Sequence, residues 1–276
     1  MEGQYLQKLK SKFARLKHEI GQLLNSADKS KYTHLQNYIY FAHHPIFSFT
    51  EAILSLCENK KPHVAEVLLR TLFEAHIDII YHQLGNSEQR LAFSTKRMFD
   101  ERITILNEIS DLIKKYPNLK SKDSKQLFNK EYLDKAIIDQ TTHREAILRA
   151  NPNFKGTKHL QDKVRLCEKG KVKNAEKGGF ERMYSLIYRQ LSPVAHLNIE
   201  GLQAFIGQDE YGKMFFHDGN DGDFVATEAI EISLAFCKDL YDNKIIVGDQ
   251  IAIIKEIEEI ISCMGDKIPS GVEMLK

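Results

Sequence analysis

The sequence has few of the features that mark secreted, metal-scaffolded or membrane proteins. Its four cysteines are widely spaced without a CxxC pair, which argues against a disulfide scaffold or a zinc module and fits a reducing cytosol. The charged N-terminal stretch MEGQYLQKLKSKFARLKHEI has no apolar core, so we expect no signal peptide. The most apolar stretch, VLLRTLFEAHIDIIY, carries three charged residues and is too short to span a bilayer. We therefore expect a soluble, cytoplasmic protein without membrane contact.

Signatures of nucleotide cofactors and metals are missing as well. The chain has no Gly-rich phosphate loop, no nucleophile elbow and no Rossmann pattern. It also has no HExxH motif and no ExxH pair of the kind found in helical di-iron sites. The net charge is +1, which supports no global attraction to nucleic acid or membranes. We expect no cofactor and no bound metal, and a helical metalloenzyme is disfavoured.

Apolar residues at three- and four-residue steps predict helices along most of the chain. We expect helices over 4–25, within 32–58 with a break at Pro45, over 63–84 beginning just after Pro62, over 88–116 and over 123–149. The helix 63–84 is apolar on most of its circumference, which is typical of a central, buried helix. Four charged residues at steps of four stack in one stripe along it: Glu66, Arg70, Glu74 and Asp78.

The second half of the chain is less regular. Residues 143–179 predict a basic, irregular loop with one short helix near 160–168, and helical periodicity returns at Phe180. Gly-rich turns and weak alternation over 202–226 predict a small β-hairpin, followed by C-terminal helices within 226–264. The fold class that we expect is all-α, with residues 1–276 forming a single helical domain that carries this hairpin as an excursion.

The stretch YRQLSPVAHLN holds the main candidate for chemistry. Arg189 and His196 are seven positions apart, which places them on one face of a continuous helix. Pro193 between them cannot donate a backbone hydrogen bond, and Ser192 before it is a good N-cap, so a helix end or kink is expected here. Such a break allows both side chains to be aimed at one small anion.

An arginine and a histidine that converge on a phosphodiester can form a metal-free ribonuclease site. The neutral imidazole of His196 can take a proton from a ribose 2′-OH, and the guanidinium of Arg189 can stabilise the growing charge on the phosphate. DNA lacks this hydroxyl and is not cut by this route. The residues themselves leave another interpretation open, in which His196 is an ordinary hydrogen-bonded histidine at a helix start.

Local charge points in the same direction. Residues 143–190 contain twelve basic and five acidic residues, a local excess of seven positive charges. This stretch leads into the Arg/His segment, where an RNA backbone needs cations. The alternative is that this stretch is a solvated loop, whose lysines keep it soluble and bind no RNA. The candidate RNA-binding residues are Lys169, Lys171, Lys173, Lys177 and Arg182.

Arg70 and Glu74 form an i,i+4 pair on the helix that we expect to be buried. Buried charges are usually paired, because an unpaired buried charge is costly. Two interpretations remain open. The pair fixes helix packing, or Glu74 orients Arg189 or His196 across the core.

Two stretches together carry a family resemblance. LLRTLFEAHIDIIY (68–81) and YSLIYRQLSPVAHLN (184–198) resemble the signatures of a group of uncharacterised bacterial helical proteins. The second stretch also resembles the Arg-x4-6-His motif of the HEPN superfamily, which consists of small, often dimeric helical bundles that include ribonuclease toxins and phage-defence effectors.

The HEPN resemblance implies a metal-independent endoribonuclease in a toxin–antitoxin or phage-defence setting. Arg189 then contacts phosphate and His196 acts as base, with Tyr188, Ser192, Arg70 and Glu74 in support. It also implies a homodimer that shares the site, RNA as substrate, and an antitoxin or defence-system partner. The alternative hypothesis is a non-catalytic helical binding or regulatory protein, in which the Arg/His/Glu cluster is structural.

Overall fold

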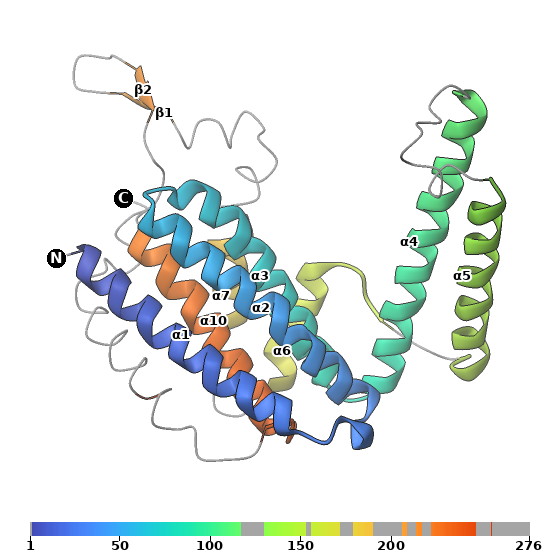
Figure 1. The fold of residues 1–276 in the computed structure, drawn as a ribbon, viewed down its shortest axis with the longest axis horizontal. Helices are drawn as coiled ribbons and strands as arrows, with labels where there is room; N and C mark the ends of the chain where they lie inside the picture. Colours follow the sequence, from blue (N-terminus) through green and yellow to red (C-terminus); the bar gives the residue numbers. More distant parts are fainter. Residues whose placement is uncertain are drawn as a thin grey trace. The chain divides into compact units, whose positions relative to one another are not determined.

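The computed structural model describes residues 2–116, 130–152, 156–171, 179–189, 206–208, 214–216, 222–246 and 255. The chain divides into two compact units, where the sequence predicted a single domain. The first unit combines residues 1–84 with 160–276, and the second, residues 85–159, is inserted between them. Figure 1 shows the elements of both units. The described part is almost entirely helical, as the sequence predicted.

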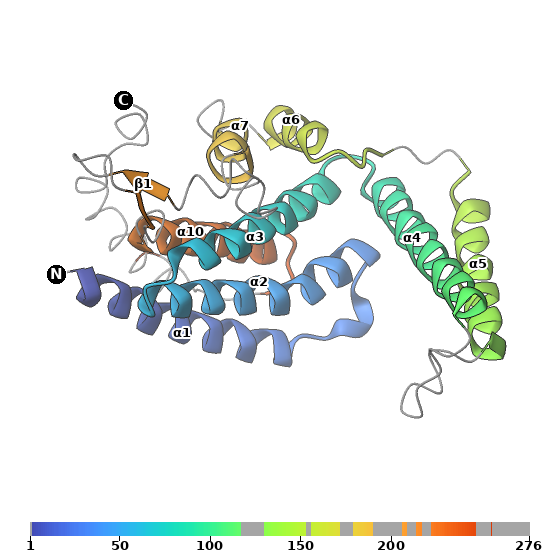
Figure 2. The same ribbon diagram turned by 90° about the horizontal axis from the view of Figure 1, so that it is seen from above.

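The first unit is a helical bundle built on four long helices. They are α1 (Glu2–Ser26), α2 (His34–Glu58), α3 (Pro62–Gln83) and α10 (Gly222–Asp242), and a short 3-10 turn, η1 (Lys29–Lys31), follows α1. Figure 2 shows α1 and α3 on opposite sides of α2, with α10 alongside. Rings of Phe13, Phe47 and Phe236 meet edge to face, with centroids 5.8 and 6.0 Å apart. These contacts join α1, α2 and α10 in one core.

The helix predicted over 4–25 is confirmed as α1, and its apolar residues at three- and four-residue steps are buried. The predicted break at Pro45 is wrong, since α2 runs through it from His34 to Glu58. Thr33 begins α2 with a capping box, in which its hydroxyl accepts from the Gln36 amide and the Gln36 side chain accepts in return. A proline removes only one intrahelical bond, and the burial of one whole face of α2 offsets that loss.

Helix α3 is the central helix, as predicted, and Pro62 occupies its first turn. Buried hydrogen bonds between side chains set the position of its neighbour α10. His76 on α3 contacts Asp239 at 3.2 Å, and Thr50 on α2 contacts Ser233 at 2.7 Å. Because unmatched buried polar groups are costly, these pairs favour one register of α10 over others.

The first unit also contains the helices α6 (Leu160–Lys171) and α7 (Gly179–Met183) and the π-helical segment η3 (Tyr184–Arg189). The short helix predicted near 160–168 is confirmed by α6, which runs three residues further to Lys171, and residues 143–150 of the predicted irregular loop belong to α5. The apolar side of α6, where Val164 and Cys167 are buried, holds this short helix on the bundle.

Two three-residue strands, β1 (Ile206–Gln208) and β2 (Met214–Phe216), pair antiparallel, with Gly207 opposite Phe215. The remainder of the predicted hairpin lies outside the described residues, up to the start of α10 at Gly222, four residues before the expected end of the hairpin. Of the C-terminal helices expected within 226–264, α10 covers the part up to Asp242, and residues 247–254 and 256–264 lie outside the described residues. The HEPN-like topology of the bundle stays a prediction.

The second unit is a hairpin of two helices, α4 (Ser87–Lys115) and α5 (Lys130–Ala150). Asn86 precedes α4 in the left-handed conformation, with φ of 64°, and turns the chain out of α3. Arg144 of α5 bonds Asp100 of α4 at 2.6 Å, and Phe99 stacks on His143. Opposite charges and rings thus join the two helices along their shared side.

Candidate functional site

The polar stripe of α3 lies where the sequence places it, and its members differ in exposure. Glu66 is buried, the Arg70 side chain is 12% exposed, and those of Glu74 and Asp78 are 42% and 38% exposed. The Arg70 Nε donates to Glu74 Oε1 at 3.0 Å. One part of the predicted interpretation is therefore confirmed: Arg70 and Glu74 form an ion pair within α3.

Arg70 also contacts the second sequence motif. Its guanidinium carbon lies 4.4 Å from the centre of the Tyr188 ring, and its Nη2 donates to the Tyr188 Oη at 3.2 Å. Tyr188 in turn stacks on Tyr184, with centroids 5.1 Å apart and an interplanar angle of 13°. The stripe of α3 and the YRQLS segment, 118 residues apart, are thus in direct contact.

The segment Tyr184–Arg189 is a π-helix, a form that the sequence did not predict. π-helical turns are rare and often occur at functional sites, because the wider turn shifts the residues after it around the helix. Ile187 is buried in the core, while Tyr188 lies against Arg70. The π-helix ends at Arg189, one residue after the tyrosine that contacts α3.

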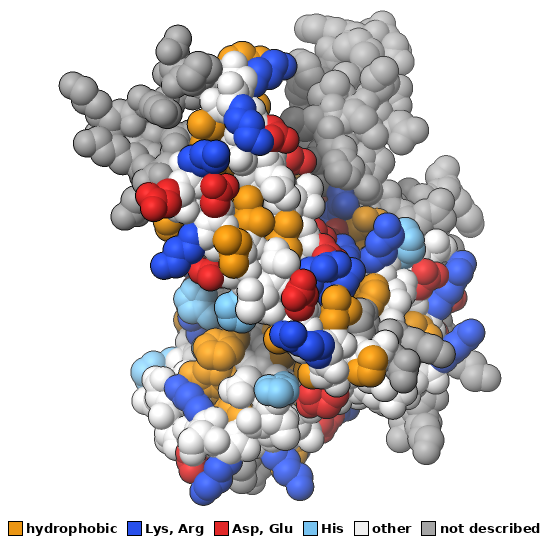
Figure 3. Space-filling view, turned by 90° about the vertical axis from the view of Figure 1, so that its right-hand side faces the viewer, with side chains coloured by type: hydrophobic (Ala, Val, Ile, Leu, Met, Phe, Trp, Pro, Cys, Tyr) orange, Lys and Arg blue, Asp and Glu red, His pale blue; other side chains and the backbone are white. Residues whose placement is uncertain are grey.

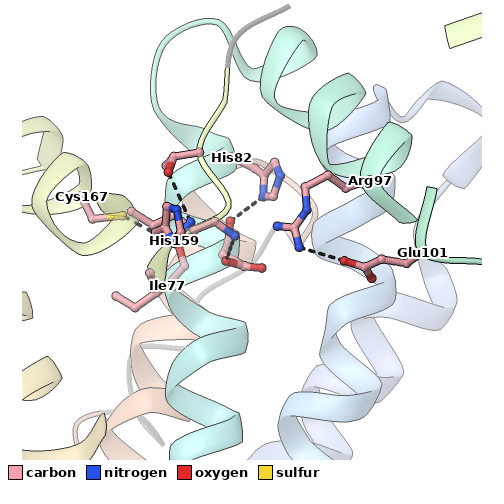
Figure 4. Close-up of polar contacts among 9 residues, drawn as sticks. Ile77, His82, Arg97, Glu101, His159 and Cys167 are labelled. Atoms are coloured by element: carbon pink, nitrogen blue, oxygen red, sulfur yellow. Dashed lines mark hydrogen bonds and ion pairs between the residues drawn. The ribbon is translucent and has the colours of Figure 1, made fainter. Parts of the chain in front are cut away.

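Helix α6 covers the other end of the stripe. Lys163 Nζ bonds Asp78 Oδ1 at 2.6 Å and lies 5.5 Å from the centre of the Tyr81 ring. Figure 4 shows Cys167 of α6 directed at Ile77 of α3, where its Sγ lies 3.8 Å from the Ile77 carbonyl oxygen. Lys163 is buried, so it holds α6 on α3 and does not contribute to the positive surface charge of residues 143–190.

Of the predicted RNA-binding residues, Lys169 on α6 and Arg182 on α7 are exposed. The side chains of Lys171 and Arg189 lie outside the described part, as do Lys173, Lys177, Ser192 and His196 altogether. The structure therefore brings together Arg70, Glu74 and Tyr188. The pairing of Arg189 with His196 stays a prediction.

Arg182 lies within electrostatic range of two acids on α10 that sequence reasoning missed. Burial raises the pKa of Glu228 from 4.5 to about 7, the charge of Glu231 raises it further, and Arg182 opposes both effects. A signal was present, because Glu228 and Glu231 lie in the largely apolar first part of the helix, among Val225, Ala226, Ala229, Ile230 and Ile232. Their charge offsets that of Arg182, which weakens Arg182 as a phosphate contact.

Among the residues that the structure describes, no group of three or more histidine, cysteine, aspartate or glutamate side chains is placed to hold a metal ion. Within the same residues, none of the helices is both long and apolar enough to cross a membrane. The face in Figure 3 carries charges of both signs with histidine and hydrophobic side chains among them.

The fold and the site together define a helical-bundle protein in which a charged stripe on a central helix contacts a π-helical tyrosine segment. The chain belongs to a family of unknown function, DUF5677, whose model matches residues 36–214, more than half of the chain. Both motifs lie inside this match, and α1 and α10 lie outside it. No curated protein and no solved structure matches the chain.

Proposed function

We propose that the protein is a HEPN-like, metal-independent endoribonuclease in which Arg189 and His196 act on the RNA backbone. The observation that carries the proposal is the contact between Arg70 and Tyr188, with a donor–acceptor distance of 3.2 Å. Tyr188 directly precedes Arg189, so this contact holds the start of the Arg/His segment against the partly exposed stripe of α3. A phosphate that binds beside this stripe lies next to the segment that carries Arg189, and the contact between Arg70 and Tyr188 holds the backbone of that segment in position.

The chemistry follows from the two residue types. His196 takes the proton of the ribose 2′-OH, and the 2′-oxygen attacks the adjacent phosphorus. The bond from phosphorus to the 5′-oxygen of the next nucleotide breaks, and this oxygen takes a proton from solvent water. The products are a 2′,3′-cyclic phosphate and a 5′-hydroxyl. Arg189 donates two parallel hydrogen bonds to the phosphate and stabilises the charge that grows on it in the transition state.

The proposal extends to binding and partners. Lys169, with the expected contributions of Lys171, Lys173 and Lys177, supplies positive charge next to the site for the RNA backbone. A second copy of the chain completes the site, as the HEPN resemblance implies. In a toxin or phage-defence role, an antitoxin or another defence-system protein restrains the activity.

The test is cleavage of a mixed RNA by the purified chain in excess EDTA. We expect fragments that end in a 2′,3′-cyclic phosphate, and no fragments from the same RNA with every 2′-OH methylated, since the nucleophile is then blocked. Absence of cleavage across varied RNAs sinks the proposal. Cleavage that EDTA abolishes shows a metal-dependent nuclease and contradicts it equally.

A second candidate function is a non-catalytic helical binding or regulatory protein, and one observation favours it. The side chain of Arg70 is only 12% exposed, and its charge is matched by Glu74 while its face covers the Tyr188 ring. Such a cluster can serve simply to fasten η3 to α3.

Arg70→Ala is expected to lower the free energy of unfolding by about 1–3 kcal/mol, because it leaves Tyr188 and Glu74 without their shared cation. The matched control is Arg97→Ala, which breaks another i,i+4 Arg–Glu pair, with Glu101 (Figure 4), and should cost about 0.5 kcal/mol or less. Urea denaturation measures both. Equal small losses exclude the structural role, while a clear loss with full RNA cleavage by the folded variant confines Arg70 to that role.

A further inference from the structure

The hairpin of α4 and α5 buries very little of itself. Among its described residues only Ala92 and Leu133 are buried, although the two helices contain 29 and 21 residues. Isolated helices gain most of their stability by packing an apolar face against another element. A pair of helices with so small a core is typical of half of a larger bundle.

Helix α4 has two apolar stripes, and the hairpin uses one of them. Ile103, Leu106 and Ile113 are part-buried and continue, at helical steps, from Phe99, which stacks on His143 of α5. At 100° per residue, a second stripe lies about a quarter turn away, with steps of three and four that repeat every seven residues. Its apolar members from the middle of α4 onward are Met98, Ile105, Ile109, Leu112 and Tyr116, and Arg102 interrupts them.

Three members of this second stripe are open to solvent, while Met98 and Ile109 are part-buried. Ile105, Leu112 and Tyr116 are 54%, 50% and 47% exposed. Single exposed apolar residues are ordinary, but a run at heptad spacing along one helix marks an interaction surface.

We propose that this stripe of α4 packs antiparallel against the same stripe of a second copy of the chain, so that two hairpins form a four-helix bundle. The inference depends on the hairpin alone and not on the proposed nuclease activity. A two-fold axis pairs a surface with itself, so the surface must be complementary to its own reverse. We place the two-fold axis midway between Ile105 and Ile109. Ile105 of one copy then packs against Ile109 of the other, and Met98 packs against Tyr116.

The charges beside the stripe favour this arrangement. Acidic Glu101 and Glu108 lie in the first and middle parts of the stripe's edge, and Lys115 lies in the last turn. The antiparallel order puts Glu101, which also pairs with Arg97 of its own helix, beside Lys115 of the second copy, twice per dimer. The same order brings the two Glu108 side chains together near the axis, where Arg102 of each copy lies close to the second copy's Glu108 and offsets their repulsion. A parallel order in register places these three residues of the two copies on opposite flanks of the seam, so it forms no Glu101–Lys115 pair. The stripe is therefore suited to its own reversed copy.

The test is the oligomeric state of the full-length chain by sedimentation equilibrium at micromolar concentration. We expect a dimer, and we expect Ile105→Glu combined with Leu112→Glu to raise its dissociation constant at least about a hundredfold, because the variant places charges in an apolar seam. Ile138→Glu is the matched control, since Ile138 on α5 is 63% exposed and lies outside the stripe. A monomeric wild-type chain overturns the proposal and leaves the stripe to another part of the chain or another protein.

Charge exchange tests the orientation. Glu101→Lys and Lys115→Glu should each weaken the dimer, and the double variant Glu101→Lys/Lys115→Glu should recover most of the loss, because the antiparallel pair is restored with its signs reversed. Circular dichroism checks that all variants stay helical. The antiparallel α4 interface is overturned if the Ile105/Leu112 double variant still forms the dimer. It is also overturned if the double charge variant loses as much dimer affinity as the two single charge variants together.

Discussion

His196→Ala is expected to lower the rate of RNA cleavage in EDTA by about 10²–10⁴-fold, because the variant has no group to take the proton of the 2′-OH. The rate of the wild-type protein should fall as the pH drops below about 6.5, where a free imidazole becomes protonated and can no longer act as base. Measurement of single-turnover cleavage from pH 5 to 8 separates this effect from substrate binding.

The matched control is His18→Ala, since His18 is an exposed histidine of α1 whose ring contacts Gln22. It should leave the rate and its pH dependence unchanged. Arg189→Lys should retain a positive charge but lose the two-pronged contact with phosphate, and should therefore cleave more slowly than wild type with a similar pH profile. If His196→Ala and wild type cleave at the same rate, His196 is not the base and the proposed mechanism is wrong.

Glu228→Gln is expected to stabilise the protein at pH 8 by up to about 3 kcal/mol, with little difference near pH 4.5. Burial raises the pKa of Glu228 from 4.5 to about 7, so the folded protein disfavours the charged carboxylate. The stability that the protonated form contributes is complete below about 4.5 and is lost as the pH rises through about 7. Glutamine keeps the neutral form at every pH, so the gain grows over this window.

Urea denaturation at half-unit steps of pH from 4.5 to 8 measures the effect. Glu231→Gln is the control: it removes the neighbouring negative charge that raises the Glu228 pKa, so it should give a smaller gain of the same sign. Removal of the opposing cation with Arg182→Gln should widen the gap between Glu228→Gln and its parent. A difference between Glu228→Gln and wild type that does not vary with pH contradicts the raised pKa.

The helices that sequence periodicity predicted best are those with one clear apolar face. In α1, the residues from Leu9 to Leu24 at three- and four-residue steps are buried as expected. The failures have a common physical origin in packing between distant segments. Pro45 was expected to break a helix, yet burial along α2 maintains it. Lys163, one of the twelve basic residues of 143–190, is buried against Asp78 and Tyr81.

The same origin explains the site residues that were found and those that were missed. Arg70 and Glu74 were recognisable because their i,i+4 spacing is local and a helix fixes its geometry. Glu228 was missed, because its raised pKa depends on burial and on charges that only the fold assembles. The π-helix at Tyr184–Arg189 was missed as well. A single π-helical turn fits the same pattern of apolar residues as an α-helical turn, and differs in that its backbone hydrogen bonds join residues five positions apart instead of four.

The sequence by itself determined that this is a helical protein, that α3 is its central helix, and that a stripe of charges runs along that helix. These features depend on spacing within a few turns, where the backbone of a helix dictates which side chains are neighbours. Only the tertiary structure decided that Arg70 lies on Tyr188 and that the chain divides into two units. Contacts across 118 residues follow from how whole helices pack, and no local pattern specifies that packing.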